Sequence, residues 1–140
     1  MRCEEIMSRD PKCCVPSDTS VRAARVMKIE DVGSIPVCSS QENRQLVGIV
    51  TDRDIRLNLP SQATSLSVWE INHLLTKLTV GEVMTESVIT VGPDRDAADA
   101  ARLMLDHKIG ALPVTDGGRL IGIVTETDML RAFVRSVDGR

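Results

Sequence analysis

Aromatic side chains are almost absent from this sequence. Its 140 residues include one Trp, one Phe and no Tyr. Proteins that bind single-stranded nucleic acid stack the bases on aromatic side chains, and those that bind duplexes neutralise phosphates with a basic surface. The formal net charge here is -3, so there is no basic excess. The composition therefore argues against a nucleic-acid polymer as the partner.

Long apolar runs are missing as well. No run approaches the ~18 apolar residues that span a bilayer, and the first ten residues carry charges where a signal peptide has its apolar stretch. We therefore expect a cytoplasmic protein without a membrane partner. The four cysteines show no C-x-x-C spacing, and in a reducing compartment they are expected to be free thiols. They are Cys3, Cys13, Cys14 and Cys38.

Motifs of catalysis are also lacking. The only histidines are His73 and His107, and neither is accompanied by the residue pattern of an activated nucleophile. There is no phosphate-cradling G-x-x-x-x-G-K and no dinucleotide-binding G-x-G-x-x-G. The sequence predicts a protein that is not an enzyme, with no catalytic residue, catalytic cofactor or metal site.

What the sequence does contain is an internal repeat. Residues 7–37 align with residues 84–114 at a constant offset of 77. The offset then falls to 74, because the first copy has a turn that is three residues longer, and residues 46–56 align with 120–130. Identical residues occupy 15 of these 42 aligned positions, in the same order in both copies. One structural unit is therefore expected to occur twice.

Each copy is expected to contain a helix, a short strand, a turn, a buried strand and a second helix. The turn of the second copy, Asp116-Gly117-Gly118, is a strong hairpin signal. The strands that follow the turns, at 46–50 and 120–124, are apolar on both faces and are predicted to be buried. One copy is too small to bury its own apolar faces. The predicted fold is α/β (α+β), with two small sheets packed in a pseudo-twofold pair and flanked by helices.

The repeat divides the chain into a domain at 1–58, a linker at 59–80 and a domain at 81–140. Within the linker, Ser67 and Glu70 have capping-box spacing and predict a helix start. Residues 60–65 are predicted to form a loop. A packed linker is favoured over a helix that binds a partner, and its apolar stripe follows helical spacing. That stripe comprises Ile71, Leu74, Leu75 and Leu78.

The repeated motif resembles that of a known family. Each copy has G-I-V-T-x-x-D, with I-P-V or L-P-V upstream and M-S or M-T at its start. These motifs resemble the CBS-domain family, and two copies in one chain resemble a Bateman module. Residues 65–85 are similar to the linker of the small CBS-only proteins of the acetoin-utilisation subgroup. The resemblance implies that AMP, ADP, ATP or S-adenosylmethionine binds in clefts between the copies. It also implies a flat homodimer that regulates a partner protein, whose identity the sequence does not give.

The candidate ligand site lies where the buried strand of each copy meets the following helix. A helix N-terminus has unpaired N–H groups and a partial positive charge, which favour phosphate. In the family the equivalent Asp holds the ribose and the equivalent Thr contacts ribose or phosphate. In the first copy these positions are Asp54 and Thr51, with Arg53 placed to meet a phosphate. In the second copy the corresponding residues are Thr125, Thr127 and Asp128. Both Thr-x-x-Asp patterns also fit helix capping boxes, and the two roles are compatible.

The base of a nucleotide needs flat apolar walls. The first strand of each copy and the segment that precedes it could supply them, and their backbone groups could read the adenine edge. Core packing is an equally good interpretation of the same residues. The candidate wall residues are Ile35, Pro36, Leu112 and Pro113 in the strands, with Pro11, Lys12, Val88 and Ile89 before them.

One departure from the family bears on the choice of ligand. Many nucleotide-binding members have a His or Arg just before the apolar-Pro-apolar strand, where this sequence has Gly33-Ser34 and Gly110-Ala111. AMP or ADP is therefore favoured over ATP. The first site is expected to be the better phosphate binder, and the second is expected to stay empty or to hold an uncharged adenosine compound. The leading hypothesis is an adenosine-nucleotide sensor that modulates a partner. The alternatives are a ligand-independent dimerisation module and an accessory subunit in acetoin-type carbon metabolism.

Overall fold

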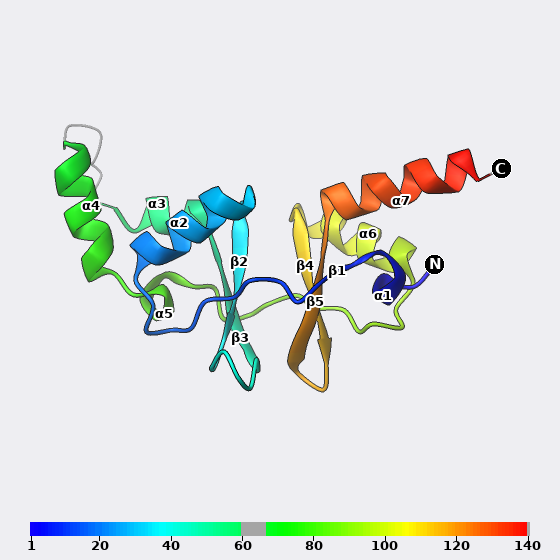
Figure 1. Ribbon diagram of the computed structural model, residues 1–140, viewed down its shortest axis with the longest axis horizontal. Coiled ribbons are helices and arrows are strands. Elements are labelled where there is room, and N and C mark those ends of the chain that lie inside the picture. The colour runs from blue at the N-terminus through cyan, green and yellow to red at the C-terminus, as the bar shows by residue number, and fades with distance from the viewer. Residues whose placement is uncertain (60–66, 140) are drawn as a thin grey trace. The chain divides into compact units, whose positions relative to one another are not determined.

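The computed structural model describes residues 1–59 and 67–139. The chain forms two compact units, one of residues Lys12–Val88 and the other of Met1–Pro11 together with Ile89–Arg140. The compact units therefore do not coincide with the repeats. Residues 1–11 belong to the unit of the second repeat, and residues 84–88, where the second repeat begins, belong to the unit of the first. The two units are described separately below (Figure 1).

The unit of residues 12–88 is built on an antiparallel pair of strands, β2 (Ser34–Cys38) and β3 (Leu46–Thr51). Its helices are α2 (Ser20–Glu30), α3 (Asp52–Leu57), α4 (Val68–Lys77) and α5 (Val80–Val83). The core combines the buried face of α2 with both strands and α5. Ser67 caps α4 by accepting a hydrogen bond from the N–H of Glu70 at 3.2 Å, as predicted. Leu75 and Leu78 pack against the core, which agrees with a packed linker. The predicted loop at 60–65 lies outside the described residues.

The other unit contains a three-stranded antiparallel sheet in the order β1-β5-β4. The strands are β1 (Ser8–Arg9), β4 (Ala111–Asp116) and β5 (Arg119–Thr125), and the helices are α1 (Cys3–Ile6), α6 (Ala97–His107) and α7 (Glu126–Asp138). The β4–β5 turn is the predicted hairpin. Its Gly117 and Gly118 have φ of 59° and 84°, the positive values that a tight hairpin requires.

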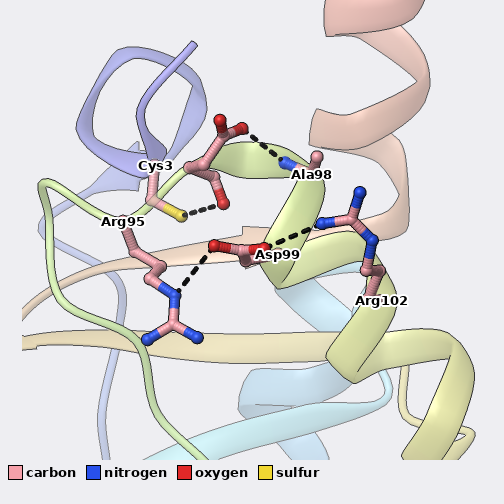
Figure 2. A network of polar contacts seen from close by, with 6 residues as sticks. Cys3, Arg95, Ala98, Asp99 and Arg102 are labelled. Carbon is pink, nitrogen blue, oxygen red and sulfur yellow. Dashed lines mark hydrogen bonds and ion pairs between the residues drawn. The ribbon is translucent and has the colours of Figure 1, made fainter.

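The N-terminal segment is held against the start of α6 by backbone hydrogen bonds. The N–H of Cys3 donates to the carbonyl of Arg95 at 2.8 Å, and the N–H of Ala97 donates to the carbonyl of Met1 at 2.7 Å. Figure 2 shows the Cys3 thiol directed at the same turn, where Asp99 joins Arg95 and Arg102 in one ion-pair network. Cys3 is fully buried, and this burial raises the pKa of its thiol. The segment is therefore an integral part of this unit.

Matching backbone contacts place a short segment at the edge of each sheet. Ser8 in β1 pairs with Ile123 of β5. In the other unit, Thr85 exchanges two backbone hydrogen bonds with Ile49 of β3, at 2.9 and 2.8 Å. The repeat alignment equates Ser8 with Thr85 and Ile123 with Ile49. Sequence patterns do not reveal such pairings, because one or two residues show no periodicity.

The predicted fold class of helices with small sheets in two copies is confirmed, and two details differ. The second strands are buried on one face only: Val50 is fully buried whereas Ile49 is half-buried. Helical spacing in the sequence predicts one stripe with Ala97, Ala98, Ala101, Met104 and Leu105. The buried stripe of α6 is instead centred on Ala100 and Met104, and Leu105 is 77% exposed. No helix in the described parts of the chain is long and apolar enough to span a bilayer.

Candidate functional site

The strand-to-helix corner of the first repeat is fixed by reciprocal hydrogen bonds between Thr51 and Asp54. The Thr51 hydroxyl accepts from the N–H of Asp54 at 3.0 Å, and Oδ2 of Asp54 accepts from the N–H of Thr51 at 2.9 Å. This is a capping box, one of the two roles expected for the pair. Capping holds the Asp54 carboxylate in a defined position at the corner.

Part of the polar surface of this corner remains unpaired. Asp54 is half-buried, and its Oδ1 accepts no hydrogen bond from the residues that the structure describes. The side chain of Arg53 is exposed, and its guanidinium forms no ion pair or hydrogen bond within the described ranges. The corner therefore contains a carboxylate oxygen that can accept from hydroxyl groups, and the preceding residue in the sequence carries an available cation.

The backbone of α3 offers less to a phosphate than the sequence suggested. Of its first three N–H groups, that of Asp52 donates to the Gly33 carbonyl at 3.1 Å and that of Asp54 donates to Thr51. Of these three, only the N–H of Arg53 has no partner among the described residues. Helix α3 is six residues long, with two acidic residues in its first turn. A phosphate at this corner would depend on side chains, above all on Arg53.

The corner of the second repeat has the same capping box but a more fully occupied carboxylate. Thr125 and Asp128 repeat the reciprocal bonds, at 2.9 and 3.2 Å, and the Thr125 hydroxyl lies 3.0 Å from Oδ2 of Asp128. Oδ1 of Asp128 accepts from the Ser8 hydroxyl at 3.1 Å and lies 3.6 Å from Arg131. Asp128 is only 5% exposed, so both of its oxygens are engaged inside this unit. Thr127 is exposed.

Ser8 is the site residue that the sequence reasoning missed. Its counterpart Thr85 lies on the equivalent pairing position in the first repeat, where no hydrogen bond joins it to Asp54 within the described chain. The M-S and M-T dipeptides that open the two copies were the available signal. They place a hydroxyl at the same aligned position, but nothing local indicates that the hydroxyl reaches a carboxylate 120 residues later.

The predicted wall residues are buried in the cores of their own units. Ile35 is 2% exposed and Leu112 is fully buried, and Pro36 and Pro113 are also fully buried. The carbonyls of the two prolines accept hydrogen bonds from Cys14 and Val91, so these backbone groups serve the fold. The structure thus displays the packing role for these four residues.

The segments before the strands divide between the units. Lys12 belongs to the unit of residues 12–88 and has an exposed side chain, whereas Pro11 belongs to the other unit. Val88 belongs to the unit of residues 12–88 and Ile89 to the other unit, and both are half-buried. Of these four, only Lys12 brings a charge to the unit that contains Asp54.

No cluster of three or more metal-ligating side chains occurs in the residues that the structure covers.

Comparison with known sequences gives consistent matches over most of the chain. The family model of the CBS domain matches residues 3–61 and 80–135. The CBS domain-containing protein YhcV of Bacillus subtilis is 35% identical over 114 residues, which cover 81% of this chain and 72% of YhcV. The uncharacterized protein MK0525 of Methanopyrus kandleri is 31% identical over 128 residues, and this chain spans 60% of its length.

Solved structures of similar fold include proteins with bound adenosine compounds. A putative acetoin utilization protein (AcuB) from Vibrio cholerae superposes with a TM-score of 0.83 at 28% identity, covering 99% of this chain and 93% of that one. CBSX2 of Arabidopsis thaliana in complex with AMP gives a TM-score of 0.76 at 30% identity over 96% of each chain. The CBS domain pair of protein MJ0100, with 5-methylthioadenosine and S-adenosyl-L-methionine, gives 0.75 at 27% identity, covering 97% of this chain and 98% of that one.

Proposed function

The chain belongs to the CBS-domain family, and on that premise we propose that it is a regulatory module that binds an adenosine nucleotide at the Asp54 corner. The observation that carries the proposal is the contrast between the two carboxylates. Among the residues that the structure describes, Oδ1 of Asp54 has no hydrogen-bond partner and the neighbouring Arg53 is exposed, whereas both oxygens of Asp128 are engaged. The AMP complex of CBSX2 supports the choice of ligand class.

The chemistry of the corner favours a nucleotide with few phosphates. Asp54 can accept hydrogen bonds from ribose hydroxyls, and Arg53 and Lys12 supply the cations for a phosphate. Asp52, which is exposed, adds a negative charge next to Arg53 and already pairs with Arg56 at 3.2 Å. Each further phosphate would increase repulsion from this carboxylate, so AMP or ADP is preferred to ATP.

Binding can regulate a partner only if the nucleotide has different affinities for two arrangements of the protein. The expected physiological role is therefore a nucleotide-dependent change in how the two units engage a partner protein. The partner protein is expected to bind this chain with an affinity that changes when AMP or ADP is present.

Calorimetric titration with AMP, ADP, ATP and S-adenosylmethionine tests the proposal. We expect AMP or ADP to bind, and Asp54→Ala to weaken binding at least about tenfold, because it removes the acceptor for ribose. Thr127→Ala is the matched control, since Thr127 is exposed at the second corner, and it should leave affinity unchanged. The proposal is wrong if none of the four compounds binds with a dissociation constant below millimolar. It is also wrong if Asp54→Ala binds the nucleotide with the same affinity as the wild type.

The small residue before β2 offers a gain-of-affinity test. A Cβ built on Gly33 meets no atom within 4 Å, and the φ of Gly33 is not positive, so a larger side chain fits there. Gly33→Arg should tighten binding of ADP and ATP about tenfold by adding one charge-assisted contact to phosphate. The control is Gly110→Arg, because a Cβ there lies 3.4 Å from the Glu126 carboxylate, which would pair with the new cation. The affinities are measured by calorimetry. If both variants bind ATP with the affinity of the wild type, Gly33 is remote from the phosphates.

A second proposal, homodimerisation, rests on the surface of α7. Four apolar side chains, Leu130, Phe133, Val134 and Val137, follow i, i+3, i+4, i+7 spacing and are between 47% and 66% exposed. Such a stripe on a helix favours burial against a partner surface, and a second copy brings the same stripe in a self-complementary contact. Phe133→Asp should convert a dimer to a monomer in analytical ultracentrifugation, with Arg131→Ala as the control. A wild-type chain that sediments as a monomer at micromolar concentration would exclude this role for α7.

A further inference from the structure

Three of the four cysteines lie together at the end of β2. Cys14 pairs with Val37 in a parallel bridge, and the N–H of Cys38 donates to the carbonyl of Cys14 at 2.8 Å. Neighbouring residues of an extended segment point to opposite sides. Cys14 accordingly belongs to the core, while the Cys13 thiol is hydrogen-bonded to the Cys38 thiol. Both are free thiols, and both lie on the side of this ladder that faces away from Cys14.

The second repeat shows that the fold does not require sulfur at these two positions. Val91 pairs with Val114 in the same parallel bridge, and the N–H of Thr115 donates to the carbonyl of Val91 at 3.0 Å. The repeat alignment equates Cys13 with Thr90, and the matching backbone hydrogen bonds equate Cys38 with Thr115. The same backbone therefore carries a thiol pair in one repeat and two threonines in the other.

The longer turn of the first repeat covers this pair. Gln41 lies in the turn at 39–45 and donates from Nε2 to the Cys13 carbonyl at 2.9 Å, and its Oε1 lies 3.4 Å from the Cys13 sulfur. Gln41 is itself exposed, and Cys13 is 7% exposed. The exposed side chain of Gln41 therefore lies over the buried Cys13.

The two thiols differ in their protonation. The Cys38 thiol as hydrogen-bond donor lowers the pKa of Cys13 to about 6, with help from the Arg44 charge and against burial and the Asp18 charge. The same hydrogen bond and burial raise the pKa of Cys38. Burial and Asp18 raise the pKa of Cys14 to about 11. These directions favour the thiolate form on Cys13 over Cys38 and Cys14, and the thiolate is the reactive form of cysteine.

We propose that Cys13 and Cys38 form a redox modification site, at which a hydroperoxide oxidises the thiol pair to an intramolecular disulfide and a thiol reductant reverses the reaction. The Cys13 sulfur attacks hydrogen peroxide, the O–O bond breaks, and sulfenic acid and hydroxide form. The Cys38 sulfur then attacks the Cys13 sulfur, the S–O bond breaks, and a second hydroxide leaves. The protons of Cys38 and of the medium convert both hydroxides to water. Two thiols lose two electrons and the peroxide gains them.

Thiol mapping of the folded chain tests the site. The reduced protein is treated with hydrogen peroxide, denatured, alkylated with iodoacetamide and analysed by peptide mass spectrometry. We expect one linked pair, Cys13–Cys38, with Cys3 and Cys14 still alkylated, and full reversal by dithiothreitol. In Cys38→Thr, which carries the second repeat's residue, Cys13 should instead accumulate as sulfenic acid that dimedone traps. Four alkylated thiols after peroxide, or a linkage of any other pair, would overturn the proposal.

The pH profile of Cys13 alkylation provides a readout that a purely structural pair would not give. In the wild type the rate should be half-maximal near the pKa of about 6. In Cys38→Thr the midpoint should move above pH 8, and alkylation at pH 6.5 should slow about fivefold, since the gain in nucleophilicity offsets part of the lost thiolate. Cys3→Ser is the control and should leave the profile unchanged. Identical midpoints in the wild type and in Cys38→Thr would contradict the assignment of Cys13 as the reactive thiol.

Discussion

Replacement of Asp128 by alanine is expected to lower the free energy of unfolding by about 3 kcal/mol. Asp128 is 5% exposed and accepts hydrogen bonds from the Thr125 backbone, the Thr125 hydroxyl and the Ser8 hydroxyl. Its loss leaves these donors unsatisfied, removes the cap of α7 and releases β1 from its side-chain contact with the corner. Guanidinium denaturation monitored by circular dichroism measures the change.

The matched variant is Asp54→Ala, at the same position of the first repeat. Asp54 is half-buried, and among the described residues its carboxylate bonds only within the capping box, so its replacement should cost about 1 kcal/mol. Ser8→Ala should reproduce part of the Asp128→Ala loss, because it removes one of the same bonds. Equal losses for the two aspartates would contradict the view that Asp128 is a structural carboxylate and Asp54 is an available one.

Replacement of Gly122 or Gly48 by alanine is expected to destabilise the protein by about 2 kcal/mol each. A Cβ on Gly122 would collide with Sδ of Met7 and lie 3.1 Å from the carbonyl oxygen of Ser8. On Gly48 it would lie 2.6 Å from Sδ of Met84 and 3.0 Å from the carbonyl oxygen of Thr85. The thioethers can move aside, but each carbonyl belongs to a backbone segment paired with the strand. Glycine is therefore required because a second backbone approaches the strand closely.

Thermal unfolding followed by circular dichroism tests this requirement, with Gly33→Ala as the control. Gly33 has open space around its Cα, so alanine there should change stability by less than about 0.5 kcal/mol. In Gly122→Ala the displaced Ser8 should also lose its bond to Asp128, so adding Ser8→Ala should cost less in this background than in the wild type. Additive losses would show that the segment holding Ser8 does not move.

The sequence predicted the elements of each repeat because their signals are local. The Asp-Gly-Gly turn, the apolar strands and the Ser67 cap each depend on residues within one element, and the structure contains all of them. The exact face of α6 was harder to predict, because alanines at 97, 98, 100 and 101 make several faces apolar. Packing selects the face with Ala100 and Met104, and Leu105 is left exposed.

The candidate site was less predictable because its contacts are between distant residues. Thr51 and Asp54 were found through their spacing, but the spacing is the same for Thr125 and Asp128. Ser8 and not the local motif distinguishes the two corners, and its contact depends on β1 joining β5. The thiol pair likewise requires the segment at Cys13 to lie beside the end of β2.

A crystal structure grown with millimolar AMP tests the central claim most directly. Asp54 and Asp128 occupy equivalent positions in a repeated sequence, yet only one of them is expected to hold the ligand. We predict a ribose whose hydroxyls lie within hydrogen-bond distance of the Asp54 carboxylate, with the Ser8–Asp128 bond intact. A ribose bound instead to Asp128, with the Ser8 hydroxyl displaced, would contradict the account.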